Sequence, residues 1–274
     1  MSNRHWLAVI ALAGAVIALA APSYLHRLAP AGIAVRYPEG TVHGFLELRT
    51  ESGALLAHGD LTQIVKDGAI DSHMIFHFAD SATLFEETVR FTQAGAFAIE
   101  SYHLIQRGSV FPFAIDASLA RDGHYIVKTT SKAKNAVETQ YAGKLDLPAD
   151  VANGLVITLA KNIAPRETAS VHIVAFTPEP RVIGLEIAPS GTHDAMLGGH
   201  VERTTEFVLT PKLGAALHFF ASLAGKAPPE SHAWIIADDV PAFIRFEGPM
   251  YDGPVFRLTP ASPTWPAGEG SATH

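Results

Sequence analysis

The chain contains 14 histidines, and the pair whose spacing comes closest to a metal site is His73 and His77. Both lie in a predicted β-strand near residues 70–79, so they share one face of it. Positions four apart in a strand are about 13 Å apart, too far for one ion with ligand bonds of about 2 Å. A site would need a carboxylate from the next strand, Glu86 or Glu87 beside His77. Ordinary cross-strand pairs explain these residues better, and we predict no metal and no cofactor.

Other patterns for chemistry are missing. The remaining histidines, among them His43, His58 and His103, stand at no ligand spacing. The sequence has no G-x-S-x-G elbow for a serine nucleophile and no glycine-rich phosphate loop. A glycosidase with two carboxylates remains open, because acids from different strands can meet in a cleft, but no pair stands out. We therefore predict no catalytic residue and keep a hydrolase as the second alternative function.

Aromatic residues point more clearly to binding. Phe219 and Phe220 are neighbours in a predicted helix, about 100° apart around its axis, so one cluster of side chains cannot cover both. Rings of the predicted strands would form the facing wall of a cavity for a lipid or another apolar ligand. The predicted ligand-binding residues are Phe219, Phe220, Phe76, Phe78, Trp234 and Phe246. The competing interpretation is that the sheet and the helix bury these rings as core.

Composition excludes several classes of protein. The 274 residues include 27 acidic and 20 basic side chains, for a net charge of −7. Such a chain lacks the general positive field that a nucleic-acid backbone attracts, so we predict no nucleic-acid partner. It has no cysteine, which excludes disulfides, thiolate metal sites and a cysteine nucleophile.

The first residues have the pattern of a secretory signal. Arg4 precedes an uncharged apolar stretch, Trp6–Ala21, of 16 residues, shorter than the roughly 20 that span a bilayer as a helix. Ala18 and Ala20 supply the small residues that signal peptidase requires. We predict a signal peptide over residues 1–20, with an uncleaved anchor as the alternative, and a periplasmic or secreted location. Contact with a membrane would come only through this segment, if it is uncleaved.

Short alternating segments separated by turns predict an antiparallel β-meander rather than crossover units. The predicted strands lie near 41–50, 54–66, 70–79, 84–92, 96–107, 110–118 and 123–131, and then near 168–177, 181–189, 200–210, 232–237, 241–248 and 254–259.

Two helices are predicted between these strands. The first begins at Asp146 as N-cap and runs to Asn162, and the second begins at Thr210-Pro211 and ends at Gly225. Two helices can cover one face of so many strands only if the sheet bends around them. The fold class is therefore mainly β with two helices (α+β), a strongly curved antiparallel sheet or incomplete barrel that wraps the helices.

The predicted organisation is a single β-rich domain. After the signal, residues 21–39 form a linker, residues 40–260 form the domain, and residues 261–274, rich in Pro, Gly, Ala and Ser, form a disordered tail.

Five segments of this domain are similar to those of an uncharacterised family of exported bacterial β-rich proteins: His43–Arg49, Gly59–Gln63, Leu145–Asp150, Asn153–Leu155 and Pro241–Pro249. That family resembles, more distantly, periplasmic domains of unknown function with the curved sheet of lipoprotein-carrier-like folds. The resemblance implies an exported protein with a curved sheet, and it assigns no catalytic or ligand-binding residue.

The function predicted from these observations is a non-enzymatic binding or carrier module for an apolar or amphipathic molecule of the bacterial cell envelope. Its partner would then be a lipid or a hydrophobic small molecule. The first alternative is a structural or interaction protein of the envelope, which would dock another envelope protein through an exposed sheet edge or an acidic face.

Overall fold

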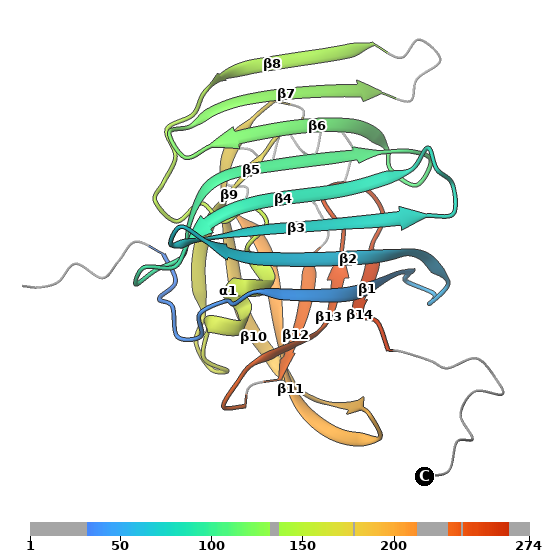
Figure 1. The fold of residues 1–274 in the computed structure, drawn as a ribbon, viewed down its shortest axis with the longest axis vertical. Coiled ribbons are helices and arrows are strands. Elements are labelled where there is room, and N and C mark those ends of the chain that lie inside the picture. Colours follow the sequence, from blue (N-terminus) through green and yellow to red (C-terminus); the bar gives the residue numbers. More distant parts are fainter. Residues whose placement is uncertain (1–31, 132–136, 178, 213–229, 237, 263–274) are drawn as a thin grey trace, which may run out of the picture.

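The computed structural model describes residues 32–131, 137–177, 179–212, 230–236 and 238–262. Within these ranges the chain forms one α-helix and one antiparallel sheet of 14 strands that does not close (Figure 1). The predicted antiparallel, mainly β fold is confirmed, whereas the prediction of two helices is not matched by the described residues.

The first half of the sheet is a meander in which each strand pairs with the next one along the chain. Its strands are β1 (Val42–Thr50), β2 (Leu55–Lys66), β3 (Ala69–Phe78), β4 (Leu84–Thr92), β5 (Ala98–Arg107), β6 (Phe113–Ala120), β7 (His124–Ser131) and β8 (Glu138–Lys144).

The second half is also a meander. Its strands are β9 (Ala169–Ala175), β10 (Arg181–Leu197), β11 (His200–Lys212), β12 (Ser231–Ile236), β13 (Ala242–Gly248) and β14 (Phe256–Pro260).

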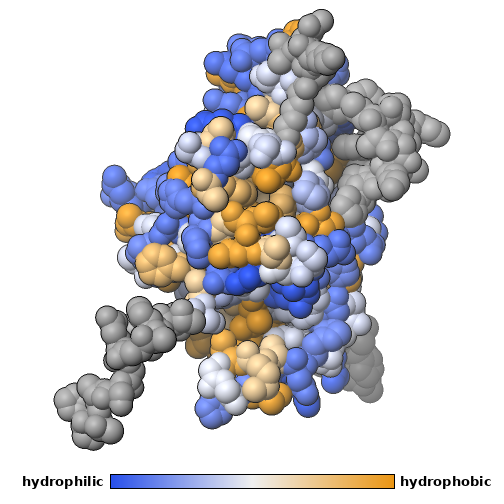
Figure 2. All heavy atoms as spheres, turned by 90° about the vertical axis from the view of Figure 1, so that its right-hand side faces the viewer, coloured by the Kyte–Doolittle hydropathy of each residue, from blue (hydrophilic) through white to orange (hydrophobic). Residues whose placement is uncertain are grey.

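The halves are joined where β1 pairs with β14, so that β8 and β9 form the two ends of one sheet. In Figure 1, β1–β8 run across the view in front of β9–β14, whose strands cross them steeply. Aromatic contacts connect the two halves through the core: Tyr102 stacks on Phe176 at 5.9 Å between ring centroids, and Phe111 meets the edge of Phe256 at 6.0 Å. Apolar residues also gather toward the middle of one side of the surface, between bands of hydrophilic ones (Figure 2).

The helix is shorter than the predicted one and begins later. The helix α1 (Val156–Asn162) follows Leu155 as N-cap, without a side-chain cap. Asp146 is therefore not the N-cap. Gly154 has φ of 73°, a left-handed conformation through which a right-handed helix cannot run. The residues before it instead form hydrogen bonds to β9, through Ala152 and Asn153.

The predicted start of the second helix is wrong. Thr210 and Pro211 belong to β11, where they lie opposite Glu186 and Leu185 of β10. Proline is tolerated there because β12 pairs with β11 only as far as Leu209. The rest of the predicted helix, with Phe219 and Phe220, lies outside the described residues.

Candidate functional site

One row of side chains crosses the outer face of β1–β8. The strand register places its members directly opposite one another, and we call them the outer row: His43, Thr62, His73, Thr88, His103, Ser118, Ile126 and Ala142. The row lies on the face away from the core, because the residues that follow it in sequence, such as Val89, Leu104 and Val127, are buried. From β1 to β6 its side chains can form hydrogen bonds, whereas on β7 and β8 they are aliphatic.

Each histidine of the outer row is hydrogen-bonded to a carboxylate on the following strand. The distances from Nε2 to the carboxylate oxygen are 3.2 Å for His43–Asp60, 2.8 Å for His73–Glu86 and 2.9 Å for His103–Asp116. Successive pairs are two strands apart, or about 9.5 Å. The carboxylates fix the orientation of the imidazole rings, so the face carries a regular series of oriented polar groups.

The histidines considered as metal ligands are paired differently from the sequence hypothesis. His73, rather than His77, contacts Glu86, and His77 lies 3.5 Å from Asp60 on the other side of β3. Glu87 is on the opposite face of β4 and contacts neither. Across the part of the chain that the structure describes, no group of three or more His, Cys, Asp or Glu side chains is arranged to hold an ion.

A shallow trough of about 850 Å³ surrounds the end of the outer row on β4–β8. Small side chains create it, because Ser118 and Ala142 lie opposite Ile126 on the two neighbouring strands and leave half of its surface exposed. The hydroxyl groups of Thr88, Ser101 and Ser118 line the trough together with polar groups of His103, His124 and Lys144. The trough thus combines an aliphatic strip with a hydrogen-bonding strip.

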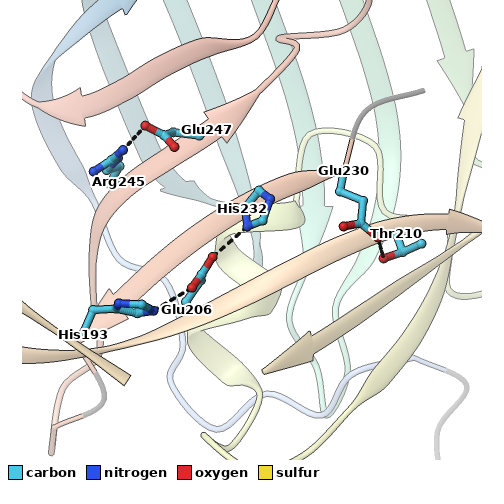
Figure 3. Close-up of polar contacts among 7 residues, drawn as sticks. All are labelled: His193, Glu206, Thr210, Glu230, His232, Arg245 and Glu247. Atoms are coloured by element: carbon cyan, nitrogen blue, oxygen red, sulfur yellow. Dashed lines mark hydrogen bonds and ion pairs between the residues drawn. The ribbon is translucent and has the colours of Figure 1, made fainter. Parts of the chain in front are cut away.

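The outer face of the second half carries a different polar cluster, built around Glu206 of β11 (Figure 3). His193 Nε2 and His232 Nδ1 each lie 2.7 Å from one of its carboxylate oxygens. Burial would raise the pKa of Glu206, but hydrogen bonds from His232, Ser190 and His193 outweigh it and keep the pKa below its ordinary value. Glu206 is therefore a well-satisfied carboxylate.

Trp234, a predicted ligand-binding residue, lies on this same face next to the cluster. Its ring stacks on His232, and the Arg245 guanidinium lies 4.7 Å from the centre of a Trp234 ring. Arg245 also pairs with Glu247, which accepts a second hydrogen bond of 2.7 Å from Arg257. These contacts connect β12 to β13 through a cation–π contact and β13 to β14 through paired charges.

The Glu206 cluster lacks the order of groups that a serine hydrolase needs. In such an enzyme a histidine lies between the serine and the carboxylate and takes the proton of the hydroxyl. Here the hydroxyl of Ser190 bonds directly to the carboxylate. The cluster therefore offers no relay that would activate Ser190.

The other predicted ligand-binding aromatics of the described residues lie on the core side of the sheet. Phe76 is fully buried against Phe85, Phe78 is half-buried against Phe111, and Phe246 packs on the core from β13. Trp234 lies on the opposite face from them. The predicted aromatic cavity stays a prediction, because its two helix residues are not described.

A half-buried acid on the core side of the sheet was missed by sequence reasoning. Tyr102 donates a hydrogen bond of 2.7 Å from its hydroxyl to Glu87 Oε1, in the interior next to Phe176. Burial raises the pKa of Glu87, and the bond from Tyr102 offsets part of this rise. Adjacent acids on β4, Glu86 and Glu87, thus face opposite environments.

The outer row was missed as well, although the sequence holds a signal for it. His43, His73 and His103 stand thirty residues apart. An equal spacing over two hairpins places identical side chains at the same height on alternate strands. The signal becomes readable only when the strand pairing is known, because scattered histidines at other spacings surround it.

Within the described residues, no helix has the length and apolar character needed to cross a membrane.

No family model matches the chain, and neither the curated proteins nor the solved structures contain a match.

Proposed function

We propose that the protein is a non-enzymatic binding module for an amphipathic molecule of the cell envelope, and that it holds this molecule in the trough on β4–β8. One observation carries the proposal: within the trough, the outer row passes from hydrogen-bonding to aliphatic side chains. A molecule lying along the row would place its polar head against His103 and Ser118 and its hydrocarbon part against Ile126 and Ala142.

The chemistry of the trough favours an uncharged head group that is rich in hydroxyls. The two imidazoles of the trough already have carboxylate partners, His103 with Asp116 and His124 with Asp122. These acids and the net charge of −7 oppose an anionic head group. Hydroxyl groups can donate to and accept from serine, threonine and imidazole, so a sugar-like head group fits.

The signal-like pattern of residues 1–20 supports a periplasmic or secreted protein, so we expect the ligand in that compartment. In that compartment, lipids with sugar head groups belong to the chemistry of the envelope surface. The module would bind such a molecule without altering it, since the trough presents no activated nucleophile.

Octyl glucoside below its micelle concentration is a suitable probe, and isothermal titration calorimetry measures its affinity. The substitution Ile126→Asp should weaken binding about tenfold or more, because burying an isoleucine against hydrocarbon contributes about 1.5–3 kcal/mol. Octyl sulfate, which has the same chain and an anionic head, should bind the unmodified protein more weakly.

The matched control is Ile64→Asp. Ile64 lies on the same outer face in β2 with 49% of its surface exposed, against 52% for Ile126, but outside the trough. This variant should keep the affinity of the unmodified protein. If both variants kept the affinity of the unmodified protein, or if both lost it to the same extent, the trough would be excluded as the site.

A further inference from the structure

The two edge strands of the sheet are finished differently. At β9 the segment 150–153 closes the edge: Ala152 N–H donates to His172 O at 2.8 Å, and His172 N–H donates back into the segment at 3.3 Å. The Asn153 side chain then takes both backbone groups of Val174, at 2.8 and 3.0 Å. The outward backbone groups of these β9 residues are thus already paired, and a further strand cannot add there.

The edge at β8 is open. It pairs with β7, and across the described ranges no backbone hydrogen bond reaches its other side. Leu145 N–H donates to Gly123 O, so odd-numbered residues bond to β7 and even-numbered ones turn their backbone groups outward. β8 contains no proline, and its side chains are exposed except for that of Tyr141, which packs on the core. Such an edge is a template for another strand.

We propose that this other strand is β8 of a second copy of the chain, paired antiparallel about a two-fold axis at Tyr141. Charge complementarity within β8 carries the proposal. With Tyr141 opposite Tyr141 of the second copy, Glu138 stands opposite Lys144 of the second copy, and the symmetry repeats this pair. Both residues lie on the outer face of the sheet, opposite Thr130 and His124 of β7.

The hydrogen-bond pattern agrees with this register. Two edges can pair only through residues whose backbone groups point outward, here the even-numbered ones, and the register joins Gln140 to Ala142 of the second copy. Tyr141 then occupies a position without hydrogen bonds, where the Cα atoms of opposite residues come within about 4.5 Å. The two tyrosine rings meet there on the core side, so that the core continues across the axis.

The pairing does not depend on the proposed ligand, and it is measured without one. It has a consequence for the trough, because Ala142 and Lys144 line both the trough and the free edge. Two copies joined through β8 would bring their troughs side by side on one continuous face.

Charge reversal tests the register. Light scattering over a range of concentrations should find the unmodified chain at twice the mass of one copy. Glu138→Lys and Lys144→Glu should each raise the dissociation constant about tenfold or more, because each places like charges opposite one another twice. The double variant E138K/K144E should return to within about threefold of the unmodified protein. Both positions are exposed, so folding should be unchanged. A monomeric chain at all concentrations, or a double variant as weak as the single ones, would overturn the proposal.

Engineered disulfides provide a second measurement, since the chain has no cysteine. After oxidation, a mixture of Gln140→Cys and Ala142→Cys chains should form a cross-linked dimer, because opposite Cα atoms lie about 5.5 Å apart in hydrogen-bonded pairs. Either variant alone should cross-link at least tenfold less, since its cysteines are offset by two residues. Cross-linking of either variant alone, equal to that of the mixture, would contradict the register.

Discussion

Histidines pair with carboxylates on the outer faces of both halves, but Asp116 on the first half and Glu206 on the second differ in how completely they are satisfied. On the first half, Asp116 has one histidine partner and its side chain is 53% exposed. On the second half, Glu206 is 15% exposed and has two histidines and a serine as partners. Glu247 likewise receives two arginines.

The difference shows two uses of an exposed sheet face. A carboxylate that is mostly withdrawn from water needs several partners, because an unpaired one would lose its hydration without compensation. The Glu206 and Glu247 clusters thus consolidate the second half. Among the described residues, the hydroxyl groups of the outer row have no side-chain partner, and such free hydrogen-bonding capacity is the property required of a binding surface.

The largest expected effect is on the stability of the second half. Glu206→Gln removes the charge that His193 and His232 share and leaves one of them facing an amide N–H. Hydrogen bonds to charged groups contribute about 1.5–3 kcal/mol, so the free energy of unfolding should fall by about 2 kcal/mol. Urea denaturation followed by circular dichroism measures this change. A loss near zero would mean that this face is no better consolidated than the first.

Acid should affect the second half next. Glu206 and Glu247 have pKa values below the ordinary value of 4.5, because hydrogen bonds from His232 and Arg257, with others, outweigh the effect of burial. A carboxylate whose pKa is lower in the folded state stabilises the protein above the unfolded pKa, and this stability is lost as the pH falls through the folded value. Urea midpoints should therefore drop from pH 6 to pH 3.

The control for the acid experiment is the double variant E206Q/E247Q. It should lose less stability between these two pH values than the unmodified protein, since amides do not titrate. An equal loss in the variant would assign the acid sensitivity to other carboxylates.

The smallest effect is expected on the first half. Asp116→Asn makes the same change from acid to amide beside His103, but at an exposed site, where ion pairs contribute about 0–1 kcal/mol. The free energy of unfolding should change by about 0.5 kcal/mol or less in the same urea assay. A loss as large as that of Glu206→Gln would remove the distinction between the two faces.

Most strands could be predicted from the sequence because one face of each is buried. Some turns could be predicted as well. At Asp67-Gly68 both residues have positive φ, as a two-residue hairpin requires. β8 could not be predicted, since an edge strand that turns only Tyr141 toward the core shows no alternation of apolar and polar residues. The helix was predicted to begin at Asp146, which is too early, because Asn153 forms hydrogen bonds to β9 rather than within its own segment.

The candidate sites were harder to predict than the fold. The cluster of Glu206 draws His193 from β10 and His232 from β12, and the sequence does not reveal which strands pair. The thirty-residue spacing of the histidines can be recognised as a row only when the register of the strands is known. The aromatic residues form the more visible pattern in the sequence, although those on the core side, such as Phe76, pack in the interior.

The pairing of β1 with β14 has a consequence for how the chain acquires its structure. Leu46 of the first strand lies opposite Pro260 of the last one, so this contact spans nearly the whole described sequence. Within each meander the strands pair with their neighbours along the chain, but the ladder between the two meanders must await the final strand and close a very long loop. We expect the union of the two meanders to be the slow step of folding, during which the edge of β1 is vulnerable to aggregation.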